Sequence, residues 1–371
     1  MEVLSQASAI EAKGGSVIHM ELGEPGAAAP RPAREAAKRA LDKGRIGYTP
    51  ALGIPSLRER IARHYQDTHG LSIDPQRIAV TTGSSAGFIL AFLASFDVGD
   101  RVAIASPGYP AYRNILEALG IEPVIIETGP ADRWAITPEA VRAAHEKQRL
   151  KGVLVMSPAN PTGVMMSAKA IAALSRACDQ LGLWFISDEI YHGLTYEERA
   201  STALVAATDA IVVNSFSKYF CMTGWRVGWL VLPPRLIRPV ERLAQNLFIS
   251  RPFVSQIAAE AAFEATNELE MVRAGYAQSR ALLLEALPRL GFCNLLPVDG
   301  AFYVYGDVTR LSNDSVEFCQ RALVEAAVAL TPGVDFDRTR GARHVRLSFA
   351  GSPESVREGV ERLRIWLKRG V

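Results

Sequence analysis

Residues 210–231 read AIVVNSFSKYFCMTGWRVGWLV, two apolar, β-branched runs joined by a short polar segment. The runs 210–214 and 227–232 predict buried strands, because such stretches are typical of sheets covered on both faces. Between them lie Lys218, after two serines, and Arg226. A buried lysine can lose its proton and act as a nucleophile, and the arginine fork can bind a phosphate or carboxylate. This segment therefore predicts a strand end that carries chemistry.

The same pattern extends outward along the chain. Strands are expected at 77–81, 101–105, 122–127, 152–157, 183–187, 210–214 and 227–232. Helical patterns fill most of the gaps, for example at 87–96, 112–119, 138–147 and 168–181. Short apolar strands that alternate with helices predict an α/β fold: a large domain with a mostly parallel sheet flanked by helices, plus a smaller α+β domain.

The pattern changes after residue 234. Two long helical stretches are expected, at 235–265 and 268–287, followed by a smaller α+β unit. The stretch before residue 32 is too irregular to form a domain and is expected to join the C-terminal unit or to cover the site. We therefore expect a large domain at 33–270 and a small discontinuous domain built from 1–32 and 271–371.

Composition excludes several classes of protein. The 371 residues include 41 basic and 39 acidic side chains, a net charge of +2, and 49% are hydrophobic. This balance argues against disorder and against a nucleic-acid partner. The apolar runs are too short to span a membrane, and no leader segment is visible. The histidines and the four cysteines do not have the spacing of metal ligands, so no metal site is expected. The scattered cysteines also suit a reducing compartment, so a cytoplasmic location is expected.

Polar residues follow several expected strands, and ligands of open α/β sheets bind at the carboxyl ends of strands. Gly83 opens a small-residue turn before a helix, which could be a phosphate cradle or an ordinary turn. Asp188 ends an apolar strand and needs a partner there, either a ligand or a structural group. Asn160 follows the expected strand at 152–157 in the stretch Asn-Pro-Thr-Gly, whose residue types are also typical of an ordinary turn.

Taken together, these segments resemble the class I/II aminotransferases, in the fold-type I group that binds pyridoxal 5'-phosphate. The resemblance covers essentially the whole chain in collinear order. The matching stretches are Leu22-Gly23-Glu24-Pro25, Tyr48-Thr49-Pro50, Gly83-Ser84-Ser85, Pro107-Gly108-Tyr109-Pro110, Asn160-Pro161-Thr162-Gly163, Asp188-Glu189-Ile190-Tyr191, Ser215-Phe216-Ser217-Lys218, Met222-Thr223-Gly224-Trp225-Arg226-Val227-Gly228 and Val345-Arg346-Leu347-Ser348.

The resemblance implies a role for each matching residue. Lys218 is expected to hold the cofactor as an internal aldimine and then to move a proton at the substrate Cα. Asp188 is expected to pair with the pyridine nitrogen, Asn160 and Tyr191 to donate to the phenolic oxygen, and Tyr109 to stack on the ring. The expected phosphate ligands are Ser84, Ser85, Ala86, Ser215, Ser217 and Arg226.

The same resemblance implies how substrate and subunits come together. Arg346, with Asn160 and the backbone of Gly23, is expected to bind the substrate α-carboxylate, because a planar fork matches a carboxylate. Tyr48 is expected to reach the phosphate of the neighbouring subunit, which implies a homodimer with shared active sites. Tyr112, by contrast, is expected to be a packing residue.

The implied reaction moves an amino group from an L-amino acid to a 2-oxo acid by a ping-pong mechanism. A β-lyase that cleaves C–S bonds is the alternative on the same scaffold. Some aspartate-using relatives carry a lysine in the phosphate turn, and the stretch Ser84-Ser85-Ala86 has none. Neutral or aromatic amino donors are therefore favoured, with 2-oxoglutarate as the expected acceptor, although Arg31 or Arg251 could supply the missing charge.

A more distant alternative is an α/β-hydrolase. Residues 83–87 fit the pattern G-x-S-x-G, with Ser85 as nucleophile and with Asp335 or Asp337 and then His344 in the right chain order. The motif lies too early in the expected sheet, however, and the hydrolase interpretation leaves Lys218 without a role.

Overall fold

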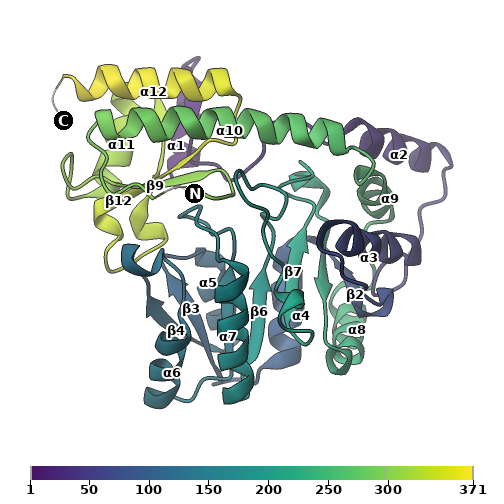
Figure 1. Ribbon diagram of the computed structural model, residues 1–371. Coiled ribbons are helices and arrows are strands. Elements are labelled where there is room, and N and C mark those ends of the chain that lie inside the picture. Colours follow the sequence, from purple (N-terminus) through teal and green to yellow (C-terminus); the bar gives the residue numbers. More distant parts are fainter. Residues whose placement is uncertain (1, 297, 370–371) are drawn as a thin grey trace.

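The computed structural model describes residues 2–296 and 298–369, and its largest element is a seven-stranded sheet with the order β2-β8-β7-β6-β5-β3-β4 (Figure 1). Only β8 runs antiparallel to its neighbours. The strands are β2 (Ile78–Thr81), β3 (Arg101–Ser106), β4 (Glu122–Glu127), β5 (Gly152–Met156), β6 (Trp184–Asp188), β7 (Ile211–Ser215) and β8 (Gly228–Val231). Each lies within two residues of its predicted position.

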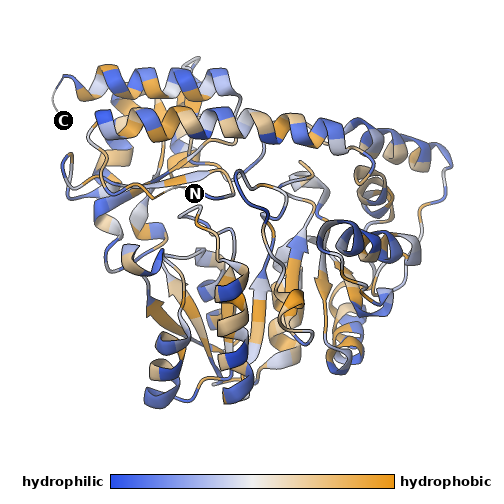
Figure 2. Cartoon of the chain, viewed as in Figure 1, coloured by the Kyte–Doolittle hydropathy of each residue, from blue (hydrophilic) through white to orange (hydrophobic). Residues whose placement is uncertain are grey.

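Helices cover both faces of this sheet, which is why β2, β7 and β8 are buried along their whole length and the sheet is mainly hydrophobic (Figure 2). One face packs against α4 (Gly83–Ser95), α5 (Pro110–Ala118) and α8 (Pro234–Phe248). The other face packs against α3 (Pro55–His69), α6 (Pro138–Lys147), α7 (Ala168–Leu181) and α9 (Phe253–Ala262), with α2 (Arg31–Asp42) beside α9. The predicted fold class is confirmed.

The chain reverses its direction across the sheet between β3 and β5. These two strands pair only at Val102↔Gly152 and Ala103↔Val153, whereas β3 continues along β4 to Ser106. The two strands therefore diverge toward their carboxyl ends. A reversal of this kind is where α/β sheets bind their ligands.

A second group of elements brings the two ends of the chain together. The strands β9 (Tyr303–Asp307), β11 (Thr331–Pro332) and β12 (His344–Ser348) form an antiparallel sheet, and β1 (Ile18–His19) pairs in parallel with β10 (Val328–Ala329). The helices α1 (Glu2–Glu11), α11 (Ser315–Ala326) and α12 (Pro353–Leu367) belong to this group, and α10 (Thr266–Arg289) packs against α12. The prediction of an irregular N-terminus missed the helix α1.

The expected helix at 235–265 is wrong as a single element. The chain leaves α8 at Ile249, which has a positive φ of 61°, and starts α9 only after Pro252. Proline lacks an N–H and disfavours helical backbone in the residue before it, so Arg251-Pro252 breaks the helix. The next helix, α10 (Thr266–Arg289), continues without a break and runs along the top of Figure 1 from α9 toward α12. None of the described helices is long and apolar enough to cross a membrane.

Candidate active site

Most predicted site residues lie at the carboxyl end of the large sheet. Asp188 ends β6, Ser215 ends β7, and Asn160 follows β5. The strand β12 and the N-terminal segment approach the same end of the sheet, because Arg346 bonds to Asn160 and Lys218 bonds to Gly23. Chain segments more than 180 residues apart in sequence thus build one site.

Lys218 lies in the turn after β7, and its amine donates a hydrogen bond to the Gly23 carbonyl oxygen at 2.5 Å. Burial, reinforced by the positive charge of Arg346, lowers the pKa of Lys218 to about 8. Desolvation disfavours the charged form of an amine, and a neighbouring cation disfavours it further. A substantial fraction of Lys218 therefore lacks its extra proton near pH 8 and can act as a nucleophile or base.

Asp188 is a buried carboxylate with two hydrogen-bond donors. The Ile190 N–H donates to Oδ1 at 3.0 Å, and the Tyr112 hydroxyl donates to Oδ2. Burial still raises the pKa of Asp188 to about 7, because only 2% of the residue is exposed. A cationic N–H placed beside this carboxylate would stabilise its charged form. Tyr112, predicted to be a packing residue, therefore also belongs to the site.

Arg346 is a buried guanidinium whose hydrogen-bonding capacity is only partly used within the described chain. Its Nη1 donates to Asn160 Oδ1 at 2.9 Å, and its Nη2 donates to the Glu21 carbonyl and to Thr331 Oγ1. Only 6% of the residue is exposed, and its Nε has no hydrogen-bond partner among the described residues. A buried donor without an acceptor is unfavourable, so this site is suited to binding an anion such as a carboxylate.

The Tyr191 hydroxyl lies 2.7 Å from the hydroxyl of Tyr303, a residue of β9 for which the sequence suggested no role. Both side chains are buried, and burial raises the pKa of each phenol. Both phenols therefore stay protonated and can donate hydrogen bonds. Tyr303 was not identifiable in advance, because no motif contains it and its partner lies 112 positions away.

The turn between β2 and α4 forms a cradle for an anion. Gly83 has a positive φ of 71°, and a Cβ atom at this position would overlap the guanidinium of Arg226. Glycine therefore lets Arg226 approach the first turn of α4, where backbone N–H groups are free. The hydroxyls of Ser215 and Ser217 lie 2.9 Å apart at the end of β7, whose neighbour β8 begins two residues after Arg226. A helix N-terminus, an arginine and two hydroxyls suit a phosphate group.

Ser84 is half-buried, Ser85 is exposed and Ala86 is buried in the first turn of α4. The hydrolase alternative has no support here, because the proposed acid Asp337 and base His344 contact other residues and not Ser85. Asp337 pairs with Arg340 at 2.8 Å, and His344 stacks on Tyr305 with ring centroids 4.8 Å apart.

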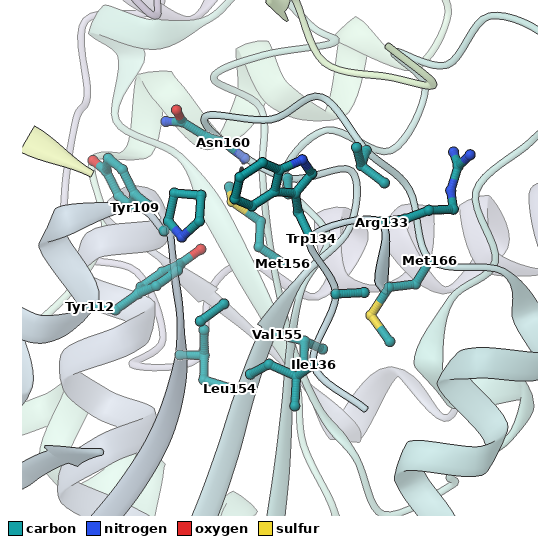
Figure 3. Close-up of a pocket in the computed structure, with 16 residues that line it drawn as sticks. Tyr109, Tyr112, Arg133, Trp134, Ile136, Leu154, Val155, Met156, Asn160 and Met166 are labelled. Carbon is teal, nitrogen blue, oxygen red and sulfur yellow. Dashed lines mark hydrogen bonds between the residues drawn. The ribbon is translucent and has the colours of Figure 1, made fainter. Parts of the chain in front are cut away.

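Tyr109 lies at the edge of a pocket that opens where β3 and β5 diverge. Its ring is 38% exposed and meets Tyr112 edge-on at 5.4 Å. Figure 3 places Tyr109 and Tyr112 on one side of this pocket and Arg133 on the other, with Trp134 between them. The remaining lining is mainly apolar and includes Ile136, Leu154, Val155, Met156 and Met166.

Tyr48 is the one predicted site residue that stands apart. It is 85% exposed, and no hydrogen bond or aromatic contact of its side chain occurs within the described chain. Its neighbour Thr49 donates to the Arg251 carbonyl, which joins residue 48 to the loop between α8 and α9. Within one chain, the structure does not bring Tyr48 to Lys218.

The side chains gathered at this site fit pyridoxal 5'-phosphate. Asp188 offers a carboxylate for a pyridinium N–H, the Gly83 turn with Arg226 offers an anion cradle, and Lys218 offers an amine with a lowered pKa. In the part of the chain that the structure describes, no group of three side chains is arranged to bind a metal ion.

Comparisons with known proteins agree with this fit. The family model "Aminotransferase class I and II" matches residues 16–363. The chain is 48% identical to a valine–pyruvate aminotransferase of Mycobacterium tuberculosis, over 99% of this chain and 95% of that protein. It is 36% identical to an aspartate/prephenate aminotransferase of Thermus thermophilus, over 97% and 93% of the two chains. A crystal structure of a Mycobacterium tuberculosis aminotransferase superposes with a TM-score of 0.96 at 48% identity, covering 100% and 96%.

The raised pKa of Asp188 makes the stability of the cofactor-free protein depend on pH. Between its usual pKa of 3.8 and about 7, the folded protein binds this proton more tightly than the unfolded chain does. The contribution of Asp188 to the free energy of unfolding therefore falls as the pH rises through this range. We expect Asp188→Asn to raise the unfolding temperature of the cofactor-free protein by a few degrees at pH 8, and by much less at pH 5.

Thermal unfolding of the cofactor-free variant and wild type at both pH values checks this expectation. Asp179→Asn, which changes an exposed carboxylate near the end of α7, is the matched control and should leave both temperatures unchanged. An Asp188→Asn protein that is no more stable than the wild type at pH 8 would contradict the account.

Proposed function

This chain belongs to the class I and II aminotransferases, which use pyridoxal 5'-phosphate, and on that premise we propose that it transfers the amino group of an apolar L-amino acid to a 2-oxo acid. The observation that carries this proposal is the buried Arg346, with an unmet Nε donor, in the same site as the amine of Lys218. A carboxylate bound at Arg346 holds the substrate where the amine can act on it.

Each proposed role follows from the chemistry of the side chain. When bound, pyridoxal phosphate supplies an aldehyde and an electron-withdrawing ring that accepts the electron pair left at the substrate Cα. Lys218 Nζ removes the Cα proton and holds it. Its lowered pKa means that both the neutral and the protonated amine are populated near neutral pH, so the amine can accept a proton and give it back. Arg346 and Asn160 orient the substrate carboxylate, and the Gly23 carbonyl positions the amine.

The remaining residues hold the cofactor in place. Asp188 would pair with the ring nitrogen, Asn160 and Tyr191 would donate to the phenolic oxygen, and Tyr109 would lie against the ring face. The phosphate would be held by Ser84, Ser85, Ala86, Ser215, Ser217 and Arg226. Preorganised donors of this kind lower a barrier without reorganising during the reaction.

An apolar amino donor is supported by what surrounds the site. The phosphate turn carries no cation among Ser84, Ser85 and Ala86, and the pocket beside Tyr109 is mainly apolar. The cation in the lining of this pocket, Arg133, already pairs with Asp299 at 2.7 Å. Arg31 lies at the surface near Glu35, and Arg251 is buried with its Nε on the Val80 carbonyl. The Mycobacterium tuberculosis relative is named for valine, an aliphatic amino acid, and for pyruvate as the partner. Pyruvate therefore joins 2-oxoglutarate as a candidate acceptor.

A homodimer is supported by an exposed apolar patch around Tyr48. The exposed apolar side chains are Leu41, Ile46 and Tyr48 on the segment that follows α2 and Leu247 and Ile249 at the end of α8, each at least 51% exposed. The bond from Thr49 to the Arg251 carbonyl brings these two segments together. Exposed apolar side chains that gather in one region mark interaction surfaces, and we propose that a second copy of this chain covers this region and receives Tyr48.

We retain the two-domain division as part of the proposal, with residues 33–270 forming the large domain and 1–32 with 271–371 the small one. The pairing of β1 with β10 supports the assignment of the N-terminal segment to the small domain. The four cysteines, Cys178, Cys221, Cys293 and Cys319, are all free, which suits the reducing cytoplasm.

A panel of amino acids tests the proposed reaction. Without an acceptor, each site should release one equivalent of 2-oxo acid from valine, leucine or phenylalanine and then stop. We expect kcat/KM for these donors to exceed that for aspartate at least ~10-fold, because an unpaired carboxylate in an apolar pocket is unfavourable. Rapid-mixing absorbance and 2-oxo acid assays measure both quantities. Continuous release of ammonia and pyruvate from a cysteine thioether would instead establish β-elimination.

Mixed dimers test the proposed role of Tyr48. Tyr48→Ala and Lys218→Ala homodimers should each be nearly inactive, since every site lacks one residue. A mixed dimer has one site with Lys218 from one subunit and Tyr48 from the other, so an equal mixture should recover about a quarter of wild-type activity with random pairing. Sedimentation confirms that both variants still form dimers. A mixture that stays inactive would show that Tyr48 does not serve the neighbouring site.

A further inference from the structure

Tyr303 contacts three positions of the proposed site from a strand that carries no recognised motif. Its hydroxyl lies 2.7 Å from the Tyr191 hydroxyl, and its ring lies 4.3 Å from the Arg346 guanidinium carbon. A Cβ atom on Gly23 would overlap its hydroxyl oxygen. Tyr303 itself is 1% exposed. One buried side chain therefore touches the carboxylate-binding arginine, the proposed cofactor-binding tyrosine and the segment that holds Lys218.

We infer that Tyr303 is a positioning residue that aims the Tyr191 hydroxyl proton at the cofactor and holds the Arg346 fork against the substrate carboxylate. This inference rests on the proposed function, because it assigns the supporting partner of two residues of that site.

The direction of the hydroxyl pair follows from counting protons. Each phenol has a single hydrogen to donate, and neither hydroxyl has another hydrogen-bond partner among the described residues. If Tyr303 donates to Tyr191, the Tyr191 proton stays free for an acceptor in the site, and both hydrogens are used. The reverse arrangement leaves the Tyr303 hydrogen without an acceptor. A hydroxyl that accepts one hydrogen bond also becomes a better donor of the next.

The ring of Tyr303 acts on Arg346 through its face. The guanidinium carbon lies 4.3 Å from the centroid of this ring and 4.8 Å from the centroid of the Phe336 ring. Cation–π contact in a buried setting restrains the plane of the fork, and Asn160 fixes one edge of it. The hydroxyl and the ring thus have separable effects, and substitution can remove one without the other.

Gly23 leaves room for this arrangement. Its backbone is not in the left-handed region, so its conformation alone would allow an alanine. Tyr303 is what excludes a side chain there. After the hydroxyl oxygen, the nearest atom to an added Cβ is Tyr303 Cζ at 3.4 Å, an ordinary contact. Removal of the Tyr303 hydroxyl should therefore relieve the clash that Gly23→Ala creates.

The first test compares Tyr303→Phe with Tyr305→Phe, two positions along the same strand. Tyr305 is a matched control because its hydroxyl is buried without a partner among the described residues. Tyr303→Phe should raise the pH midpoint of the visible absorbance of the bound cofactor by about half a pH unit, since a weaker Tyr191 donor stabilises the phenolate less. The KM for the amino acid should change less than about 2-fold, because the ring remains. The control should shift neither quantity.

The second test removes the ring as well. Tyr303→Leu should show the same shift of the absorbance midpoint, and its KM for every amino donor should rise about 5-fold or more, because the cation–π contact that restrains the Arg346 fork is lost. Cofactor affinity of the cofactor-free protein, followed by quenching of tryptophan fluorescence, verifies that both variants retain a folded site. Equal KM changes in the Phe and Leu variants would overturn the role assigned to the ring.

The third test is a double substitution. Gly23→Ala alone should weaken cofactor binding and shift the absorbance midpoint, and Gly23→Ala with Tyr303→Phe should bind the cofactor more tightly than Gly23→Ala alone. A double variant that is no better than Gly23→Ala would overturn the proposed packing. Wild-type protein without visible absorbance or amino transfer would refute the proposed function, whereas an active wild type with an unshifted Tyr303→Phe refutes this inference alone.

Discussion

Two basic side chains, Lys218 and Arg346, are buried in one site, and their burial determines how that site works. Loss of contact with water lowers the pKa of the Lys218 amine to about 8, and the charge of the Arg346 guanidinium, a residue only 6% exposed, lowers it further. The cost of burying Arg346 is offset by the Glu21 carbonyl, Asn160 and Thr331, which come from three distant segments. A substrate carboxylate would complete that set.

The fold supplies these partners by bringing both ends of the chain to one end of the large sheet. Pairing of β1 with β10 places the segment around Gly23 near β12, so that the Gly23 carbonyl meets Lys218. Asp188 and the Gly83 turn belong to the large sheet itself. Two glycines allow the close contacts in this site. A side chain at Gly23 would collide with Tyr303, and a side chain at Gly83 would collide with Arg226. The residues around Arg346 and Gly23 and those at the end of the large sheet thus come from different parts of the fold.

Much of this could be predicted from sequence, because motifs such as the one around Lys218 lie directly at strand ends. The strand positions followed from short apolar runs, and the carboxyl ends of parallel strands must meet. Contacts across the sequence could not be predicted in this way. Tyr112 meets Asp188 from 76 positions away and Tyr303 meets Tyr191 from 112, and neither tyrosine lies in a spacing that predicts its partner. The break before α9 was missed because the apolar period continues across Pro252. The role proposed for Tyr48 involves a second subunit, so no contact within one chain reveals it.

Every role proposed above requires Lys218 to be the amine that reacts with the cofactor. Borohydride reduction of the protein loaded with pyridoxal phosphate, followed by proteolysis and mass mapping, identifies that amine. We expect a pyridoxyl group on the peptide that contains Lys218, at about one per chain, with none on that peptide when Lys218→Ala is treated in the same way. A stable label on a different lysine, or no label on a protein that transfers amino groups, would contradict it.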